Sequence, residues 1–319
     1  QQPATSKEEG NLVAFSGPDF KATFDKQSGL LTSYLYKKHE YILNGQGPRP
    51  FFWRAPTDND YGANLPVRLK AWKEASYQEP KAESFQVTPG SNATTIKVTY
   101  RFPQTDARWD ITYKIYASGV IKVDNRFVAE GDQAPMIPRV GLRMQLPESF
   151  TDLTYYGRGP KENYRDRRTS QFIGEYAIPV KDMYEPYVRP QENNHRTDIY
   201  WCALTDKAQR GLLLIADRTF ELNASNYSLE SMDSGDTIDN GTPRTEKTHH
   251  RHLTDPLPEK MVDLFIDYRM MGVGGDDSWG ATAHEPYLIR PGKENAIEYS
   301  FSLVPFDKKE DYKYLIQQY

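Results

Sequence analysis

Hydrophobic and polar residues alternate along most of the chain, which is the pattern of half-buried β-strands. The clearest run places Ile96, Val98, Tyr100 and Phe102 on one face of a strand. Since every second side chain of a strand points to the same side, each such run supplies one wall of a core. The predicted strands span residues 20–24, 30–36, 96–102, 111–115, 120–128, 136–146, 211–217, 262–268 and 295–304.

One segment follows a helical period instead. Leu65, Leu69 and Trp72 fall at positions i, i+4 and i+7, and Pro66 suits the first turn of a helix. We therefore predict a helix over residues 65–75. The chain shows no regular alternation of strands with helices, which disfavours a parallel α/β barrel. The predicted fold class is all-β, a large antiparallel sandwich with long functional loops.

Polar segments mark the edges of the predicted β domain, which spans residues 11–306. Residues 1–10 are polar and contain Pro and Gly, which predicts a linker. Residues 307–319 are predicted to be a C-terminal tail with a short amphipathic helix. Residues 231–243 have the composition of a surface excursion. The first residue is Gln rather than Met, so we expect a piece of a longer protein.

Composition and charge exclude several kinds of partner. The net charge is −4 and no basic block of five or more residues occurs, so nucleic acid is not an expected partner. The longest apolar run, residues 212–216, is far shorter than a membrane span. Cys202 is the only cysteine and is expected to be a buried, inert thiol. Aromatic residues make up 13% of the chain, which suits both β structure and carbohydrate binding.

A Gly-rich loop that ends at Trp279 follows the predicted strand 262–268. We expect its glycines to take left-handed backbone conformations and its two acids to bond nearby backbone N–H groups. Such a stiff loop leaves two uses for Trp279, either as a plug for the domain's own core or as a flat apolar face for a sugar ring. The residues predicted to support the loop are Gly274, Gly275, Asp276, Asp277 and Ser278.

Two further loops carry secondary candidates for ligand binding. Residues 155–168 mix guanidinium and carboxylate groups, whose bidentate pairs either hold the loop beside a polar ligand or simply anchor a long loop. In residues 182–196, Glu192 and His195 could form a general acid and base pair, although two titratable side chains three residues apart are common in loops. The secondary candidates are Arg158, Glu162, Asn163, Glu192 and His195.

Metal and cofactor signatures are weak. In a strand, His250 and His252 would share a face, but no third ligand follows at a suitable spacing. Asp233, Asp236 and Asp239 lack the alternating spacing and the closing bidentate Glu of a calcium loop. The chain contains no phosphate-binding loop, nucleophile elbow or dinucleotide fingerprint. We therefore predict no metal and no cofactor in this chain.

Six separated motifs occur in a fixed order along the chain. They are FDKQSGL at 24–30, RAPTDND at 54–60, GRGPKENY at 157–164, DMYEPY at 182–187, HRHL at 250–253 and GVGGDDSW at 272–279. Any one of them is unspecific, but six in register are specific. Over roughly residues 11–305 the chain resembles the C-terminal domain of the large bacterial β-galactosidases of glycoside hydrolase family 2. That domain is also called the small-chain domain, or domain 5.

The resemblance implies a β-supersandwich of the galactose-mutarotase-like class. It also implies that the full-length enzyme hydrolyses terminal β-D-galactosides by the retaining mechanism, with two glutamates and magnesium on a (β/α)₈ barrel outside this chain. The role implied for Trp279 is a sugar platform, particularly at the aglycone subsite, which favours the platform over the plug. The implied partners are a β-galactoside or galactose and the catalytic barrel of the same parent polypeptide, and a homo-oligomer is left open. The compartment is not readable from the sequence, and we expect a soluble protein of the bacterial cytoplasm or periplasm.

Two alternatives and three departures accompany this resemblance. The alternatives are a carbohydrate-binding module and a stand-alone aldose 1-epimerase with a His and a Glu as acid and base. Residues 231–246 look inserted relative to the family, and the tail beyond Pro305 is extra. Residues 193–196 read NNHR where many relatives have NGLR, which puts the fine specificity of that loop in doubt.

Overall fold

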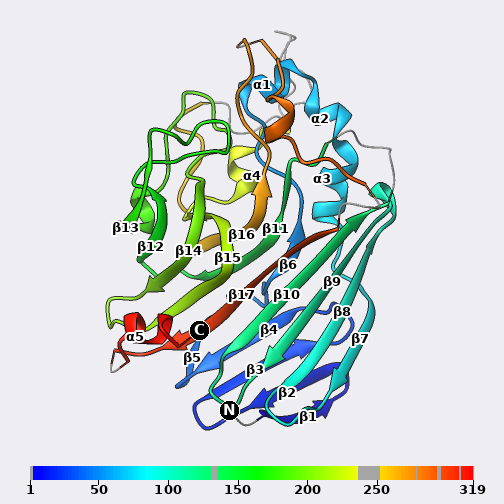
Figure 1. Ribbon diagram of the computed structural model, residues 1–319, viewed down its shortest axis with the longest axis vertical. Helices are drawn as coiled ribbons and strands as arrows, with labels where there is room; N and C mark the ends of the chain where they lie inside the picture. The colour runs from blue at the N-terminus through cyan, green and yellow to red at the C-terminus, as the bar shows by residue number, and fades with distance from the viewer. Residues whose placement is uncertain are drawn as a thin grey trace.

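Antiparallel strands make up most of the computed structural model, which describes residues 3–130, 136–235, 252–277, 279–292, 296–308 and 310–318. The strands of the large sheet are β6 (Arg49–Phe51), β7 (Ala82–Thr88), β8 (Thr94–Phe102), β9 (Ala107–Ile115), β10 (Ile121–Ala129), β11 (Arg139–Pro147), β12 (Asp152–Gly159), β13 (Phe172–Pro179), β14 (Arg196–Thr205), β15 (Gly211–Ser225), β16 (Met261–Met270) and β17 (Ile297–Phe306). Nine of them follow the order β13–β12–β14–β15–β17–β10–β9–β8–β7 (Figure 1). Strand β16 joins at β15, β11 pairs with β16, and β6 pairs with β11. All described strand pairs are antiparallel, so the predicted all-β class is confirmed.

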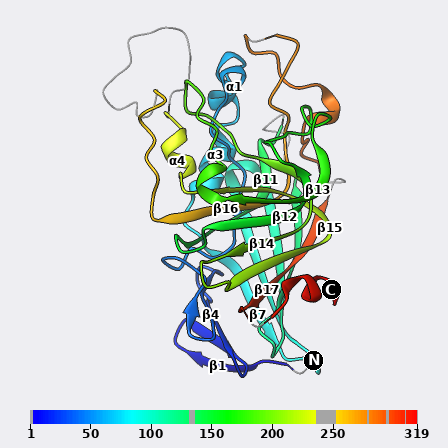
Figure 2. The same ribbon diagram turned by 90° about the vertical axis from the view of Figure 1, so that its left-hand side faces the viewer.

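A smaller sheet lies at the end of the molecule opposite the first helix (Figures 1 and 2). Its strands, which pair in sequence order, are β1 (Thr5–Glu9), β2 (Leu12–Ser16), β3 (Phe20–Asp25), β4 (Leu31–Tyr36) and β5 (His39–Glu40). Strand β1 falls within residues 1–10, so the predicted linker is wrong over Thr5–Glu9. All five side chains of β1 are exposed, because this strand forms the edge of the sheet. Its charged composition suits an edge strand, where charges discourage pairing with other chains.

The helices are short and gather mainly between residues 58 and 77. They are α1 (Asp58–Gly62), α2 (Leu65–Arg68), α3 (Lys70–Tyr77), α4 (Leu229–Met232) and α5 (Tyr312–Ile316), with 3₁₀ turns η1 (Pro103–Thr105), η2 (Val180–Asp182) and η3 (Glu285–Tyr287). The predicted helix over 65–75 corresponds to α2 and α3, which are separated at Leu69. The hydrophobic pattern missed α1, where the Thr57 hydroxyl and the Asp60 carboxylate each accept a bond from the other residue's backbone N–H. This capping box makes a helix start from residues that read as a polar loop.

The predicted helix in the C-terminal tail is confirmed by α5. Tyr312 and Ile316 of this helix pack against a small cluster on the sheet that includes Trp201 and Phe306. The Tyr312 ring lies 6.0 Å from the Trp201 ring and 5.4 Å from the Phe306 ring, measured between centroids. The tail therefore covers apolar surface at one end of β14 and β17.

Aromatic side chains form the centre of the main core. The Phe52 ring lies within 5.0–5.6 Å, between centroids, of the rings of Trp72, Phe102, Trp109 and Phe127. Trp72 belongs to α3 and the last three belong to β8, β9 and β10. The cluster thus holds α3 on the sheet, which is why the helical period around Trp72 could be read from the sequence.

Strand β15 passes from one part of the sheet to another. Its first half pairs with β17, and its second half, from Glu221 to Ser225, pairs with β16. Residues 217–219 between the halves are exposed, whereas the second half is buried throughout. Glu221 and Asn223 therefore lie inside the molecule, where polar side chains need partners. These partners lie beneath the pocket described below.

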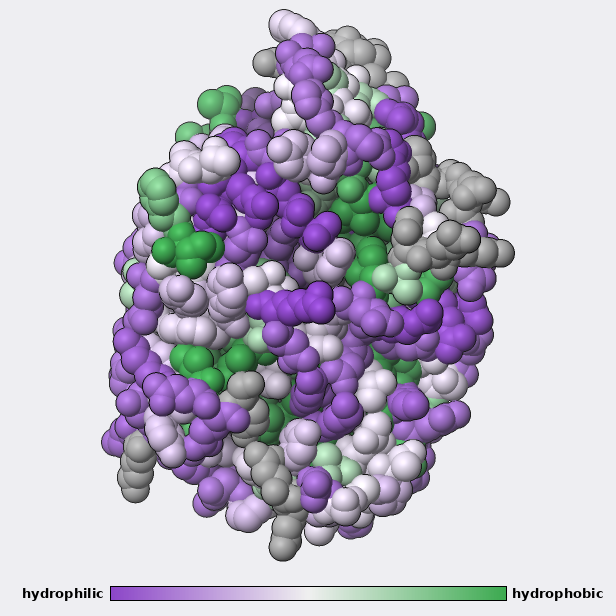
Figure 3. Space-filling model, in the orientation of Figure 1, coloured by the Kyte–Doolittle hydropathy of each residue, from purple (hydrophilic) through white to green (hydrophobic). Residues whose placement is uncertain are grey.

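The surface offers no large apolar face in the view of Figure 3. Hydrophilic residues cover most of that face, and hydrophobic residues gather in small separate patches (Figure 3). Within the described part of the chain, no helix is long and apolar enough to cross a membrane. Cys202 is a free, buried cysteine as predicted, and burial raises the pKa of its thiol.

Replacing the central ring of the core tests its position. We expect Phe52→Ala to lower the free energy of unfolding by about 3–5 kcal/mol, because the ring leaves a cavity among four other aromatic rings. Phe172→Ala is the matched control, because the Phe172 side chain is 72% exposed and its loss should change stability by about 0.5 kcal/mol or less. Urea denaturation measures both values. Equal losses in the two variants would contradict the core assignment.

Candidate functional site

Trp279 is exposed at the end of the molecule that carries α1. It lies in the loop after β16, orange in Figure 1, and its residue surface is 86% accessible. All five tryptophans belong to the described residues, and the other four are 8% exposed or less. The plug interpretation of Trp279 is therefore wrong. An exposed indole offers a ligand a flat apolar face with a polar N–H at its edge.

The start of the Trp279 loop is held by Arg54, which is 2% exposed. The Arg54 guanidinium donates to both carboxylate oxygens of Asp60, at 2.9 and 2.8 Å. It also donates to the carbonyl oxygens of Met271 and Gly272, at 2.7 and 3.1 Å. One buried cation thus links the capping box of α1 to the first residues of the loop, and bonds to charged groups are among the stronger hydrogen bonds.

Asp166 holds the same loop from the opposite wall. Its two carboxylate oxygens accept hydrogen bonds from the backbone N–H groups of Val273 at 3.1 Å and Gly274 at 2.7 Å. A Cβ atom at Gly272 would lie 2.7 Å from the Asp166 carboxyl carbon, so only glycine allows this approach. The sequence interpretation missed Asp166. The available signal was its place in the charged segment 155–168, which was expected to anchor a loop.

The backbone next to Trp279 is held by a turn and by α1. The Asp277 carboxylate accepts from Trp279 N at 2.8 Å and Ala281 N at 3.1 Å, as predicted for this acid. The Asn59 side-chain amide donates to the Asp277 carbonyl oxygen at 3.2 Å. A Cβ atom at Gly62 of α1 would lie 2.4 Å from the Trp279 carbonyl oxygen, so helix and loop pack backbone to backbone. These contacts hold the backbone on both sides of the indole.

The glycines and the first acid of the loop differ from the prediction in backbone conformation and in contacts. Neither Gly274 nor Gly275 has a left-handed φ, and Gly280 is the loop glycine that does, at +121°. Gly275 is needed because a Cβ atom there would lie 2.1 Å from the Ala281 carbonyl oxygen. Among the described residues, the contact of the Asp276 carboxylate is with the His284 ring at 2.7 Å rather than with a backbone N–H group. Ser278 lies outside the described residues.

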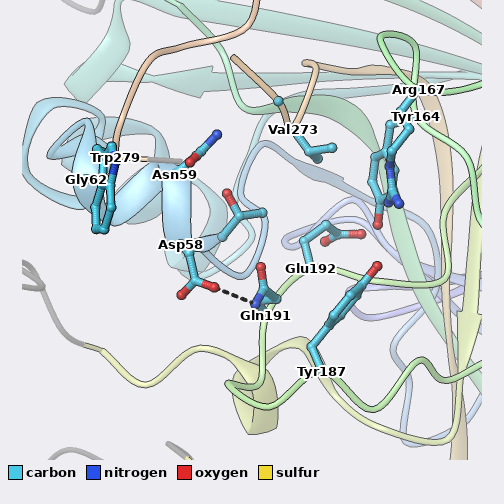
Figure 4. Close-up of a pocket in the computed structure, with 12 residues that line it drawn as sticks. Asp58, Asn59, Gly62, Tyr164, Arg167, Tyr187, Gln191, Glu192, Val273 and Trp279 are labelled. Atoms are coloured by element: carbon cyan, nitrogen blue, oxygen red, sulfur yellow. Dashed lines mark hydrogen bonds between the residues drawn. The ribbon is translucent and has the colours of Figure 1, made fainter. Parts of the chain in front are cut away.

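A pocket of about 690 Å³ opens beside Trp279. It is lined by Thr57, Asp58, Asn59, Gly62, Tyr164, Arg167, Tyr187, Gln191, Glu192, Val273, Gly274 and Trp279. Figure 4 places Trp279 on one side, next to α1, and Tyr164, Tyr187 and Glu192 on the other. Trp279 therefore forms an apolar wall, and the hydroxyl and carboxylate groups of Tyr164, Tyr187 and Glu192 form a polar wall. Apolar surface with a few placed polar groups is the usual make-up of a site for a small organic ligand.

Glu192 and His195 do not form the predicted acid and base pair. His195 is fully buried, and its two ring nitrogens lie 2.6 Å from the Asn223 side-chain oxygen and 2.9 Å from a Glu221 carboxylate oxygen. Glu192 instead accepts a hydrogen bond at 2.8 Å from the Asn223 side-chain nitrogen. Asn223 thus stands between the two residues. The Tyr164 ring lines the pocket and stacks on the His195 ring at 5.3 Å.

The surroundings of His195 favour its protonated form. Asn223 Nδ2 also donates to the Asn193 carbonyl oxygen, which fixes Oδ1 as the acceptor facing the imidazole. Both ring nitrogens therefore face acceptors and both must donate. Burial lowers the pKa of His195, but the hydrogen bond and charge of Glu221 outweigh burial and raise it above the ordinary value. His195 therefore has a structural role, because both of its ring nitrogens are bonded inside the protein.

The remaining charges of this buried network are Arg139 and Asp267. Arg139 Nη2 donates to the Asn223 side-chain oxygen at 2.8 Å, and Arg139 Nε forms an ion pair with Asp267 at 3.1 Å. A Cβ atom at Gly141 would lie 1.8 Å from Asp267 Oδ1, so glycine at the bulge in β11 makes room for this carboxylate. Burial raises the pKa of Asp267, against the opposing effects of Arg139 and His195. The network supports the polar wall from below.

Arg158, Glu162 and Asn163 anchor their loop and do not line the pocket. Arg158 Nε donates to the Asp198 carboxylate at 2.7 Å. Asn163 Nδ2 donates to the Arg158 carbonyl oxygen at 3.0 Å, and Glu162 accepts from Asn194 N at 2.8 Å. The anchoring interpretation of this segment is therefore the one the contacts bear out. Its contribution to the pocket is the position of two neighbours, Tyr164 and Arg167.

No group of three or more His, Cys, Asp or Glu side chains suited to a metal ion occurs among the described residues. The proposed histidine pair cannot be placed, because His250 lies outside those residues. The same is true of Asp236 and Asp239 of the faint calcium pattern.

The curved antiparallel sheet with a pocket at one end defines the class of fold. A galactose 1-epimerase from Lactobacillus acidophilus NCFM has a TM-score of 0.50 with this chain, at 6% sequence identity, and the match covers 95% of this chain and 97% of that one. Such low identity shows the fold alone. It confirms the predicted galactose-mutarotase-like architecture.

The chain belongs to the β-galactosidase small-chain family, since residues 16–303 match the family described as beta galactosidase small chain. A β-galactosidase from Priestia megaterium is 34% identical over 277 residues, which cover 87% of this chain and 25% of that protein. One from Lactobacillus delbrueckii subsp. bulgaricus is 32% identical over 288 residues, covering 89% of this chain and 26% of that protein. The chain therefore corresponds to one β-galactosidase domain and spans about a quarter of the length of these relatives.

The Asp277 turn predicts a pH dependence of the Trp279 loop. The bonds from Trp279 N and Ala281 N hold the pKa of the Asp277 carboxyl below its ordinary value. Because folding lowers the pKa of Asp277, its carboxylate is ionised and the turn is complete above the unfolded-chain pKa of about 3.9. The turn is lost as pH falls through the lower pKa of the folded chain. We expect the Trp279 amide signal in ¹⁵N NMR to show one acid transition below about pH 4, which Asp277→Asn abolishes. A transition at or above the ordinary Asp value would contradict this account.

Proposed function

We propose that this chain is the C-terminal domain of a β-galactosidase of glycoside hydrolase family 2, and that it completes the active site with Trp279 as a sugar platform. The observation that carries the proposal is an indole that is 86% exposed on a backbone held from three sides. Membership of the β-galactosidase small-chain family supplies the substrate class, a terminal β-D-galactoside. The proposed partner is the catalytic barrel of the same enzyme.

The chemistry of a sugar explains why an indole suits this place. One face of a pyranose ring presents C–H groups, which pack on an aromatic ring, while its hydroxyl groups point outward to polar partners. A rigid platform binds with less loss of entropy than a mobile one, because its conformation is set before the ligand arrives. The bonds from Asn59, Asp166 and Asp277 to the loop provide this rigidity.

The proposal assigns the hydrolytic step to another domain. Retaining hydrolysis uses two carboxyl groups about 5–5.5 Å apart that flank the glycosidic bond. Of the carboxylates that line the pocket, Glu192 is buried and bonded to Asn223, and Asp58 is on the exposed surface of α1. In line with the family resemblance, we propose that the two catalytic glutamates and magnesium lie on the barrel, and we expect the isolated chain to be inactive.

The two alternative functions find less support in the site. An epimerase with His195 as acid or base needs that ring to reach the sugar, but the ring is fully buried and bonded at both nitrogens. A module that holds a saccharide by itself gains affinity from a pocket that covers most of the ligand's surface. Here the Trp279 side chain is largely exposed to solvent, so the pocket leaves one side of a bound saccharide uncovered.

The test is the substitution Trp279→Ala in the enzyme that contains this chain. Covering one face of an indole buries on the order of 80 Å² of apolar surface, worth about 2 kcal/mol, so kcat/KM for a β-galactoside should fall roughly thirtyfold. Tyr314→Ala is the matched control, because Tyr314 is an exposed aromatic residue of α5 far from the pocket lining, and it should leave kcat/KM unchanged.

Two outcomes would overturn the proposal. One is a Trp279→Ala enzyme whose kcat/KM stays within about twofold of the unaltered enzyme. The other is robust hydrolysis of nitrophenyl β-galactoside by the purified 319-residue chain.

A further inference from the structure

A second pocket, of about 360 Å³, shares no lining residue with the pocket beside Trp279. It opens where β6, β11 and the end of α3 meet residues 228, 230 and 259. The Tyr77 cleft, as we name it, lies within the range of about 300–1,000 Å³ that is usual for small-molecule sites. None of its lining residues takes part in the presentation of Trp279.

The floor of the Tyr77 cleft is one face of the sheet at β6, β11 and β16. Arg143 of β11 stands opposite Arg49 of β6 on one side, and Gln145 stands opposite Asp263 of β16 on the other. Directly opposed residues of antiparallel strands point to the same face, as do residues two apart in one strand. These four polar side chains therefore gather on one face.

Arg143 gives this floor a fixed shape. Its guanidinium donates to both carboxylate oxygens of Asp263, at 2.8 Å each, and to both of Glu230, at 2.6 and 2.7 Å. The Phe51 ring centroid lies 5.1 Å from the central carbon of the same guanidinium. All four carboxylate oxygens are thus engaged by one cation, so this pair of acids is not free to act on a glycosidic bond.

Arg49 has no carboxylate partner in the described part of the chain. Its Nη2 atom donates to the carbonyl oxygens of Ser76 and Gln78, at 2.9 Å each, while Nε and Nη1 have no hydrogen-bond partner among the described residues. Burial and the neighbouring Arg143 lower the pKa of Arg49, yet an arginine stays ionised at neutral pH. The remaining N–H groups are available to an acceptor that enters the cleft.

Two amides and one carboxylate add further donors and acceptors to the lining. The side chains of Gln46 and Gln145 make no hydrogen bond within the described structure, and a bond of 2.9 Å from Gln145 N to the Gln46 carbonyl oxygen holds the two residues together. Glu259 accepts from the Ser228 hydroxyl through Oε1, and Oε2 is unengaged among the described residues. Amide groups both donate and accept, which matches the hydroxyl groups of a sugar.

Tyr77 supplies an apolar surface beside these groups. It is 40% exposed, and its ring meets the Phe51 ring edge to face, with 5.5 Å between centroids and an angle of 85° between planes. Phe51 is buried in the core, so this contact fixes the position of the Tyr77 ring. A fixed aromatic ring next to unengaged amides suits the C–H face of a pyranose.

The charges of the cleft nearly cancel. The guanidinium groups of Arg49 and Arg143 lie among the carboxylates of Glu230, Glu259 and Asp263. An anionic ligand would meet more negative than positive groups, and a cationic ligand would leave Arg49 without an acceptor. An uncharged ligand with several hydroxyl groups satisfies both conditions.

From this arrangement we infer that the Tyr77 cleft is a second saccharide-binding site, which binds an uncharged sugar ring without cleaving it. Tyr77 covers the apolar face of the ring, and the amides of Gln46 and Gln145 bind its hydroxyl groups. Arg49 adds a donor and Glu259 adds an acceptor. The inference goes beyond the proposed function, because the cleft needs neither Trp279 nor a catalytic barrel to bind its ligand.

Equilibrium dialysis of radiolabelled galactose against the enzyme that contains this chain tests the inference. Galactose is the probe because it is the sugar that the proposed function releases. Gln46→Leu combined with Gln145→Leu removes both amides at nearly constant side-chain volume. This double variant should bind one galactose per chain about tenfold more weakly, the value of two hydrogen bonds. Its melting temperature should not fall, because neither amide has a partner within the described structure.

Gln27→Leu combined with Gln86→Leu is the matched control. Both glutamines are exposed, and neither lines the Tyr77 cleft or the pocket beside Trp279. The control variant should bind galactose as the unaltered enzyme does.

Two results would overturn the inference. One is a galactose isotherm that Gln46→Leu and Gln145→Leu leave unchanged, and the other is an equal loss in the control variant. The Trp279→Ala enzyme separates this inference from the proposed function, since it should keep the galactose bound in the cleft. If Trp279→Ala leaves kcat/KM for a β-galactoside unchanged while the Gln46 and Gln145 variant loses its galactose, the proposed function fails and the cleft remains.

Discussion

The buried guanidinium of Arg54 is the contact on which the presentation of Trp279 depends. Its charge is tolerable inside the protein only because Asp60 pairs with it and two loop carbonyl groups accept its remaining protons. Asp60 is at the same time half of the capping box of α1. Helix α1 and the start of the Trp279 loop are therefore one unit, because neither can move without leaving a buried charge unpaired.

The two walls of the pocket rest on separate supports. The loop that carries Trp279 is held by Arg54, Asp166 and Asp277, whose bonds to the loop end on its backbone. The polar wall rests on the buried network around Asn223, which connects His195 to Glu192. Buried hydrogen bonds of this kind rigidify a site, and they offset the charged side chains that lie next to the pocket. Under the proposed function, a domain built in this way positions a substrate and leaves the bond cleavage to another part of the enzyme.

The sequence predicted local features well and long-range contacts poorly. Alternation identified most of the long strands because their two faces differ in burial, as in β9, but not the ten-residue strand β14. It missed β13, an edge strand whose residues are exposed or half-buried. The exposure of Trp279 followed from motif resemblance, since no local pattern distinguishes a plug from a platform. Asp166 and Asn223 could not be found, because their partners lie on distant segments, and His195 was misread for the same reason.

Oxidation of tryptophan by N-bromosuccinimide, mapped by mass spectrometry in the active enzyme, tests the central claim most directly. Within this chain Trp279 is the exposed indole, while the other four tryptophans are buried. The account predicts that Trp279 reacts first and that a β-galactoside protects it from oxidation in a concentration-dependent manner. Oxidation of Trp279 at the same rate with and without saturating galactoside would contradict its role as a sugar platform.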